Sequence, residues 1–267
     1  MKYGIVIRNC TDLRSGPKFR SERKSQLLFG EPLKIGAMRQ GYCKVYQNDG
    51  YEGWVDTRAL VILSEKGFRR FVGHYNYLAT AGTAPVRSNK KADGTICPPF
   101  IFYGTKLSVE KCRDGKAFFN LPGGGLAVIS MKNMAALSRG KMTPVKSSDI
   151  IKEVRRFLGS PYLWGGMTPY GIDCSGLVQL IYKRYGIILP RDSAEQRKRG
   201  REIKREEVKK GDLLFFKGHV AIAIDRYRII HSSLGEGGVA ENSLRPGDAG
   251  FRKDLFDTFI TARRILP

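Results

Sequence analysis

Cys174 stands at the start of a predicted helix, and two of the chain's three histidines, His219 and His231, follow it downstream. A thiol is a strong nucleophile only as a thiolate, so it needs a nearby base and a positive electrostatic setting. These residue types could supply the nucleophile and the base of a cysteine peptidase. Cys174 taken alone is explained equally well as a small buried apolar residue.

The helix that would present Cys174 is indicated by apolar spacing. Asp173 is a good N-cap, and Lys183 and Arg184 precede Gly186 as an end signal. Unpaired backbone N–H groups in the first turn could then stabilise a thiolate and an oxyanion. The apolar positions with helical spacing are Leu177, Val178, Leu180, Ile181 and Tyr185.

The two histidines lie on predicted strands. Residues 211–225 read as two strands with a break at Lys217-Gly218, and a third strand runs from Arg228 to His231. His219 and His231 each lie six residues from Asp225, so a hairpin centred there makes the rings cross-strand neighbours on one face. On that face the small Ala221 and Ala223 would leave room for the Cys174 helix. The arrangement suggests His219 as the base and His231 as the residue that orients its ring.

Several motifs in this half of the chain occur in a fixed order: Pro161-Tyr-Leu-Trp-Gly-Gly166, Gly171-Ile-Asp-Cys-Ser-Gly-Leu-Val-Gln179, Leu189-Pro-Arg-Asp-Ser193 with Gln196, Gly211-Asp-Leu-Leu-Phe-Phe216, His219-Val220 and Ile230-His-Ser-Ser233. Through this series, residues from about 145 to 267 resemble the NlpC/P60 peptidases, which are papain-like enzymes of bacterial cell-wall peptide metabolism. The resemblance implies that Cys174 is the nucleophile, His219 the base and His231 the third catalytic residue. It also implies that Tyr162 lines the active site and helps to hold the oxyanion.

The first half contains an imperfect repeat. Two motifs recur at nearly one offset, 74 residues from Gly30 to Gly104 and 73 from Val55 to Val128. Short alternating strands with Gly, Asn and Asp turns predict two small β-barrels, and one irregular all-β domain is the alternative. The pieces resemble bacterial SH3 (SH3b) domains, which often precede NlpC/P60 domains. The paired segments are 27–35 with 100–109, and 42–46 plus 53–55 with 117–119 plus 126–128.

The expected fold class is therefore α+β, with a papain-like NlpC/P60 catalytic domain preceded by two small SH3-like β-barrels. We assign residues 1–64 to the first SH3b domain, 65–140 to the second and 145–267 to the catalytic domain. Residues 64–67 and 138–145 read as linkers. Ser147-Ser148 are predicted to cap a helix whose buried face carries Ile150, Ile151, Val154, Phe157 and Leu158.

The formal charge of +22 would draw the protein to polyanions such as wall polymers. The basic residues are scattered, and no interleaved aromatic pattern indicates specific nucleic-acid binding. No apolar run approaches the roughly 20 residues that span a membrane. Residues 1–8 are too short and polar for a secretory signal and read as a first strand. We expect a cytoplasmic protein if residue 1 is the natural start, and a cell-envelope protein if a signal peptide was removed.

The five cysteines show no Cys-x-x-Cys spacing. This predicts neither a zinc site nor a disulfide framework, and a reduced compartment fits. The proposed acyl-transfer chemistry needs no metal or organic cofactor.

The resemblance also implies a substrate. Two SH3b domains before Gly-Ile-Asp-Cys-Ser-Gly look like enzymes that cut between γ-D-Glu and a diamino acid in murein peptides. In the subgroup with this architecture the peptide begins with a free L-Ala, whose ammonium would be bound by Asp173 and Ser175. Glu31 and Tyr51 would be the first barrel's contribution, although turn packing explains Tyr51 slightly better.

Asp173 would then have to divide its two oxygens between the helix cap and the ammonium. We expect Asp173→Asn to change stability hardly at all, because Asn caps helices about as well as Asp, while kcat/KM falls about tenfold to a hundredfold. The rival functions are an amidase or acyltransferase on the same scaffold and a non-catalytic wall-binding protein.

Overall fold

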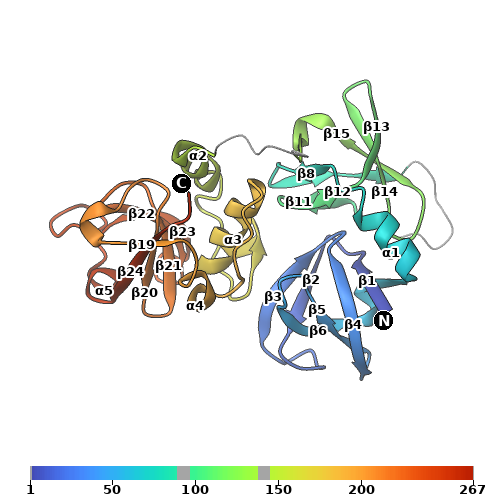
Figure 1. The fold of residues 1–267 in the computed structure, drawn as a ribbon, viewed down its shortest axis with the longest axis horizontal. Helices are drawn as coiled ribbons and strands as arrows, with labels where there is room; N and C mark the ends of the chain where they lie inside the picture. The colour runs from blue at the N-terminus through green and yellow to red at the C-terminus, as the bar shows by residue number, and fades with distance from the viewer. Residues whose placement is uncertain (1, 89–96, 138–144, 267) are drawn as a thin grey trace. The chain divides into compact units, whose positions relative to one another are not determined.

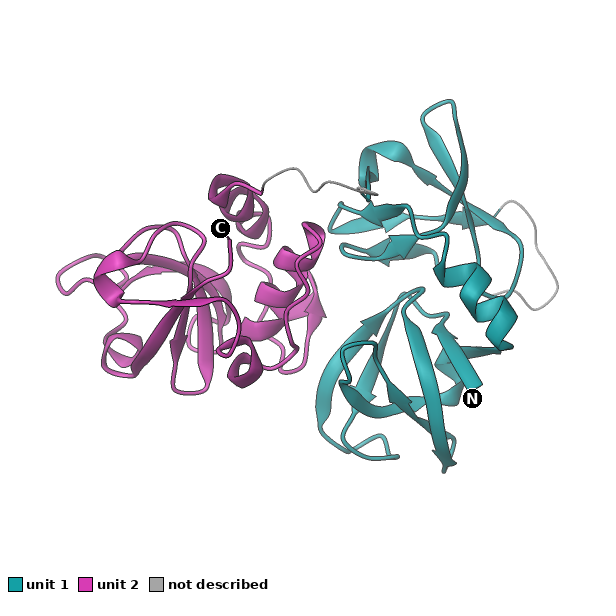
Figure 2. Ribbon diagram, viewed as in Figure 1, with its two compact units in different colours: residues 1–141 teal, residues 142–267 magenta. Residues whose placement is uncertain are grey.

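The computed structural model describes residues 2–88, 97–137 and 145–266. It divides the chain into two compact units, residues 1–141 and 142–267 (Figure 2). Of the predicted linker 138–145, all but Val145 lies outside the described residues.

The first unit begins with a seven-stranded antiparallel sheet in the order β3-β2-β6-β5-β4-β1-β7 (Figure 1). Alternating residues along its strands, such as Leu33, Ile35, Cys43 and Val45, are buried in a common core. The predicted first strand is present as β1. The elements are β1 Lys2–Val6, β2 Cys10–Arg14, β3 Arg23–Leu28, β4 Pro32–Arg39, β5 Tyr42–Tyr46, β6 Glu52–Asp56, η1 Thr57–Ala59 and β7 Leu60–Leu63.

The second part of this unit opens with a helix where the sequence suggested a linker. The Ser64 side chain accepts a hydrogen bond from the Gly67 N–H and caps α1, Glu65–Val72, so the linker prediction for residues 64–67 was wrong. Three small sheets, β10-β15-β14-β13, β11-β9 and β12-β8-β16, then enclose a second apolar core, to which Phe29 of the first part also contributes. Their elements are β8 Tyr77–Ala79, β9 Thr83–Pro85, β10 Arg87–Ser88, β11 Phe100–Phe102, β12 Lys106–Leu107, β13 Val109–Arg113, β14 Lys116–Asn120, β15 Leu126–Ser130, η2 Met131–Asn133 and β16 Met134–Ala136.

Backbone geometry repeats between these two parts at a constant offset of 74 residues. The turns Gln40-Gly41 and Asp114-Gly115 both have positive φ at both positions, the conformation that two-residue hairpins favour. Each turn leads into a hairpin, β5–β6 or β14–β15, which is followed by a 3₁₀ turn, η1 or η2. On this ground we propose that residues 65–140 form a second SH3-like barrel.

The second unit is built on a six-stranded antiparallel sheet in the order β19-β24-β20-β21-β22-β23. With its helices it makes the chain a mixed α+β protein, as predicted. Among the described residues no helix is long and apolar enough to cross a bilayer. The elements are α2 Ser147–Arg155, β17 Met167–Thr168, β18 Gly171–Ile172, α3 Cys174–Arg184, α4 Ser193–Gln196, β19 Arg201–Ile203, η3 Arg205–Glu207, β20 Leu213–Phe216, β21 His219–Ala223, β22 Arg228–Ser233, β23 Gly238–Ser243, α5 Lys253–Asp257 and β24 Phe259–Arg264.

Helix α3 begins at Cys174 and ends before Tyr185, as its sequence signals predicted, and it packs against β21 and β22. Helix α2 departs from expectation. Lys146 occupies its cap position, and the Lys146 N–H donates to Asp149. The helix ends at Arg155, so the buried Phe157 and the exposed Leu158 lie beyond it.

The two alanines of β21 point into one layer of the second unit's core. Ala221 and Ala223 are fully buried in an apolar cluster with Leu214, Leu244 and Leu255. No described residue of α3 belongs to this cluster. The prediction that the alanines leave room for α3 was therefore wrong; their small side chains accommodate strands and α5 instead.

Candidate active site

Cys174 is the first residue of α3 and is 9% exposed. Within the described residues its own N–H has no hydrogen-bond acceptor, as expected for a helix start. The N–H groups of Ser175 and Val220 face the sulfur and favour its thiolate form. Since Val220 follows His219 directly, the thiol lies against the start of β21. The helix start therefore offers backbone donors both to a thiolate and to an oxyanion.

The Asp173 carboxylate holds this helix start in place. One oxygen, Oδ1, accepts from the Gly176 N–H at 2.7 Å and from the Ser175 hydroxyl at 3.3 Å. The other, Oδ2, accepts from the Gly165 N–H at 2.8 Å. Arg191 donates to both oxygens, at 3.0 and 2.6 Å, and both side chains of this ion pair are buried. Asp173 thus ties α3 to the preceding loop and to the segment before α4.

Close backbone approach explains why glycine follows Cys174-Ser175. A Cβ atom on Gly176 would lie 2.5 Å from the Gly166 carbonyl oxygen and 3.0 Å from the Met167 sulfur. Any larger residue would push α3 away from the loop that Asp173 binds.

His219 and His231 are brought together as predicted. The His219 Nε2 and His231 Nδ1 atoms are 2.7 Å apart, and the rings meet edge to face. The hairpin register differs from the expected one, because Ile222 pairs with Ile230 and the centre is Arg226 rather than Asp225. The shift moves the cross-strand partner by two residues, so the rings are diagonal neighbours on one face rather than direct partners.

Asn242, on β23, extends the histidine pair. Its Oδ1 lies 2.8 Å from the Nε2 atom of His231, while its Nδ2 donates to Glu236 and to the Gly250 carbonyl, both at 3.3 Å. Because a carboxylate and a carbonyl can only accept, the amide nitrogen must face them and Oδ1 must face His231.

This orientation gives the chain of hydrogen bonds one direction. Asn242 Oδ1 accepts from the His231 Nε2–H, so a neutral His231 accepts at Nδ1 from the His219 Nε2–H. A neutral His219 is then unprotonated at Nδ1. The remaining ring nitrogen of His219 is therefore a proton acceptor.

Burial sets the charge state of these groups. Burial and the nearby Asp173 charge raise the pKa of the Cys174 thiol to about 11, although backbone N–H groups and Arg191 partly offset this. Burial, with help from His231 and Arg252, lowers the pKa of His219 to about 3. Burial likewise lowers the pKa of His231. At neutral pH the resting site therefore holds a thiol and two neutral imidazoles.

Tyr162 and Ser175 take different places beside Cys174. Burial and the Cys174 charge raise the pKa of the Tyr162 hydroxyl to about 12, so it remains a hydrogen-bond donor at neutral pH. The Ser175 hydroxyl donates to Asp173 and accepts from Arg191 at 2.9 Å, within the buried network.

Glu31 and Tyr51 belong to the first unit, whereas Cys174 belongs to the second. Glu31 follows the Gly30 turn, where its charge contributes to the raised pKa values of Cys10 and Tyr75. Tyr51 packs on the first core, with Lys24 Nζ 4.7 Å from its ring centroid. These contacts favour the turn-packing explanation of Tyr51.

Two residues of the site were missed in the sequence. Arg191 stood inside the recognised Leu-Pro-Arg-Asp-Ser motif, and a buried carboxylate at position 173 needs a cation, so a signal was present. Asn242 gave none, because nothing in a β-strand pattern singles out which polar residue meets a histidine on the neighbouring strand. Among the described residues no group of three or more His, Cys, Asp or Glu side chains could hold a metal ion.

Comparisons with known proteins agree with this scaffold. Two family models match: "NlpC/P60 family" over residues 159–254 and "Bacterial dipeptidyl-peptidase Sh3 domain" over residues 13–60. A gamma-D-glutamyl-L-lysine dipeptidyl-peptidase of Bacillus cereus is 30% identical over 264 residues, which cover 91% of this chain and 75% of the relative. Dipeptidyl-peptidase 6 of Lysinibacillus sphaericus is 40% identical over 115 residues, which cover 43% of this chain and 42% of the relative. A crystal structure of an NlpC/P60 family protein from Bacillus cereus has the same fold, with a TM-score of 0.87, 24% identity, and coverage of 99% of this chain and 100% of that one.

A cysteine at the start of a buried helix, packed against a sheet that carries a histidine pair, defines the papain-like class of cysteine peptidases. The chain belongs to the NlpC/P60 family of that class. Its first half carries an SH3 domain of the bacterial dipeptidyl-peptidase type.

The buried Asp173–Arg191 pair changes what we expect of Asp173→Asn. The substitution leaves Arg191 buried without a counter-charge, so the free energy of unfolding of the second unit should fall by about 3–5 kcal/mol. Asp257→Asn, which loses an exposed ion pair with Lys253, should cost about 1 kcal/mol or less. Denaturant unfolding of both variants measures the difference. Equal stabilities would show that the pair is not buried in solution.

Asn242 offers a second test. Asn242→Leu removes the acceptor for the His231 Nε2–H, so the His219 tautomer is no longer fixed and kcat should fall about tenfold to a hundredfold. Asn242→Asp keeps an acceptor at the same place and should retain the tautomer. Histidine ¹⁵N chemical shifts report the protonated nitrogen directly. Loss of activity in Asn242→Leu with an unchanged tautomer would contradict the assigned direction of the chain.

Proposed function

We propose that this enzyme hydrolyses the γ-D-Glu–diamino acid bond of murein peptides, with Cys174 as nucleophile, His219 as base and His231 as the residue that orients the base. The observation that carries the proposal is the directed hydrogen-bond chain from Asn242 through His231 to His219. It leaves the His219 Nδ1 atom as a proton acceptor at the start of β21, the strand whose Val220 N–H faces the thiol at the helix start. Free backbone donors there suit acyl transfer, because the intermediate carries an oxyanion.

The first half of the reaction forms a thioester. As the Cys174 sulfur attacks the γ-carbonyl carbon of D-Glu, His219 Nδ1 takes the thiol proton. The carbonyl oxygen becomes an oxyanion, which accepts hydrogen bonds from the Cys174 N–H and the Tyr162 hydroxyl. His231 accepts from His219 Nε2–H throughout, so the ring keeps its orientation while its charge changes.

The second half releases the products. The His219 imidazolium gives its proton to the amine of the diamino acid, which leaves as the tetrahedral intermediate collapses. A water molecule, deprotonated by His219, then attacks the thioester carbon and frees the γ-carboxylate and the thiol. Because burial disfavours every charged form here, the thiol proton should move only when the carbonyl carbon is in place.

The choice of bond is supported by the relatives. Two of them are named gamma-D-glutamyl-L-lysine dipeptidyl-peptidases, and one of these aligns with 91% of this chain. We extend that substrate class to this chain and leave the diamino acid as either lysine or diaminopimelate.

We further propose that the peptide has a free N-terminal L-Ala, since a dipeptidyl-peptidase releases a dipeptide from a free N-terminus. The matched SH3 model and the relatives' names support this part. Asp173 supports it less than expected, because its two oxygens already accept five hydrogen bonds inside the protein. Its ammonium contact therefore requires one of these donors to be displaced. Ser175 is similarly engaged, and Glu31 and Tyr51 remain proposals for the first barrel's part.

Hydrolysis of L-Ala-γ-D-Glu-diaminopimelate and its lysine analogue tests the proposal. The intact enzyme should release L-Ala-D-Glu, and Cys174→Ala should abolish release because no nucleophile remains. N-acetylated peptide should be a poor substrate if the free amine is recognised. Turnover of other amides or transfer to amines, without this hydrolysis, would instead indicate the amidase or acyltransferase. Binding without turnover by the intact enzyme would indicate a wall-binding protein.

The pH dependence follows from the lowered pKa of His219. His219 must be neutral to accept the proton, and its pKa is lowered from the ordinary 6.5 to about 3. The loss of kcat/KM on acidification should therefore occur well below pH 6.5, and activity should persist at pH 5. A profile on peptides from pH 4 to 8 measures it, with Cys174 alkylation by iodoacetamide as a substrate-free control. A half-maximal rate near pH 6.5 in both assays would mean an unperturbed imidazole.

A further inference from the structure

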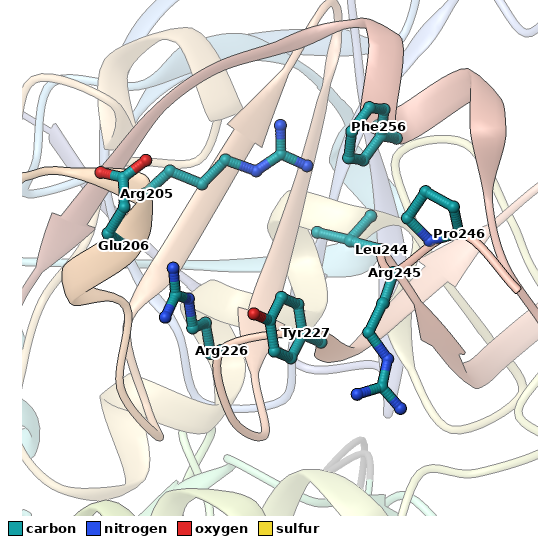
Figure 3. Close-up of a pocket in the computed structure, with 8 residues that line it drawn as sticks. All are labelled: Arg205, Glu206, Arg226, Tyr227, Leu244, Arg245, Pro246 and Phe256. Carbon is teal, nitrogen blue, oxygen red and sulfur yellow. The ribbon is translucent and has the colours of Figure 1, made fainter. Parts of the chain in front are cut away.

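A hollow lies at the end of the second unit's sheet where the β21–β22 hairpin turns (Figure 3). Its volume is about 120 Å³, enough for a group of several heavy atoms with its water. His219 begins β21 whereas Arg226 lies in the turn after it, and a strand rises about 3.3 Å per residue, so they are roughly 15 Å or more apart. The hollow is thus separate from the site of Cys174. It is lined by Arg205, Glu206, Arg226, Tyr227, Leu244, Arg245, Pro246 and Phe256.

Arg205 forms one wall and is held by aromatic rings rather than by a carboxylate. Its guanidinium carbon lies 4.3 Å from the ring centroid of Phe256 and 5.0 Å from that of Phe259. The side chain is half-buried, and no ion pair to it exists within the described part of the chain. Stacking fixes the guanidinium plane and leaves its N–H donors for another partner.

The facing wall is built around Tyr227. The guanidinium carbons of Arg226 and Arg245 each lie 5.4 Å from its ring centroid. Figure 3 shows the Tyr227 hydroxyl and the Arg226 guanidinium near each other and across from Arg205. Arg245 extends away from Arg205 and is ion-paired with Asp248, whereas Arg226 has no ion pair among the described residues.

The absence of carboxylate partners at Arg205 and Arg226 contrasts with most arginines of this unit. Ion pairs engage Arg155, Arg156, Arg191, Arg228, Arg245, Arg252, Arg263 and Arg264. Glu206 also lines the hollow, but its carboxylate lies on the side of Arg205 away from Phe256 in Figure 3. Glu206 acts electrostatically on Arg205 without forming an ion pair, so the three arginines that line the hollow still outnumber its one carboxylate.

We infer that this hollow is a binding site for a phosphate group. Guanidinium forks match phosphate oxygens, and a phosphate offers more acceptor oxygens and more negative charge than a carboxylate, so it suits donors on two facing walls. Arg205, Arg226 and the Tyr227 hydroxyl supply those donors. The phosphate comes either from free phosphate or from a phosphate-containing polymer, and the chain's charge of +22 raises the local concentration of both.

Titration of the intact protein with inorganic phosphate at constant ionic strength tests the site. The backbone amides of Arg226, Tyr227 and Arg245 should shift saturably in NMR spectra. Arg205→Gln and Arg226→Gln should each weaken binding about tenfold, the effect of losing a charge-assisted hydrogen bond. Arg199→Gln is the matched control, since Arg199 is exposed, has no ion pair among the described residues and lies outside the hollow. It should change affinity less than twofold.

Two further arms make the test decisive. A glycerol phosphate oligomer that binds tighter than inorganic phosphate identifies the polymer as the source, and equal affinities identify free phosphate; both results support the site. Acetate binding as tightly as phosphate would overturn it. So would unsaturable shifts, or equal weakening by all three arginine variants, because these indicate general charge attraction. Arg226 lies in an exposed turn, so its variant should fold even if Arg205→Gln does not.

Discussion

The rest of the active site depends on the buried carboxylate of Asp173. It accepts from the helix start at Gly176, from the loop at Gly165 and from Arg191, and so it joins three segments that are separate in the sequence. Without this junction the first turn of α3 would lose the geometry that aims its N–H groups. The same charge disfavours the thiolate of Cys174, and Arg191 offsets part of that effect. The Asp173–Arg191 ion pair thus fixes the position of the first turn of α3 and also limits how far the Asp173 charge raises the pKa of Cys174.

Local signals explain what could be predicted from the sequence. The cap and apolar spacing of α3 are contained in a dozen consecutive residues, and the break at Lys217-Gly218 defined β20 and β21 correctly. The register of the β21–β22 hairpin was harder to predict. The number of residues in a turn does not reveal which pair closes it, so the centre at Arg226 was missed by one residue. The error was an even shift of partner, which kept both histidines on one face.

The contact between His231 and Asn242 could not be predicted from local sequence signals. It depends on the pairing of β22 with β23, in which His231 lies opposite Ala240 and therefore diagonal to Asn242. It also depends on Glu236, in the loop that joins these two strands, and on Gly250, beyond β23, which together orient the amide. Neither a motif nor periodicity carries such information. Tyr51 is the opposite example: its packing on the first core could be predicted, because it follows from a local turn.

The 74-residue repeat has a consequence for how this chain folds. Two copies of one turn-and-hairpin design in a single polypeptide could exchange strands before either core forms, a typical misassembly of chains with similar neighbouring domains. The copies differ where exchange would matter: β5 reads Tyr-Cys-Lys-Val-Tyr, whereas β14 reads Lys-Ala-Phe-Phe-Asn. A β14 strand placed in the first core would present Ala117 and Phe119 where Cys43 and Val45 are buried. The difference in side-chain volume should therefore make each hairpin fit its own core better than the other core.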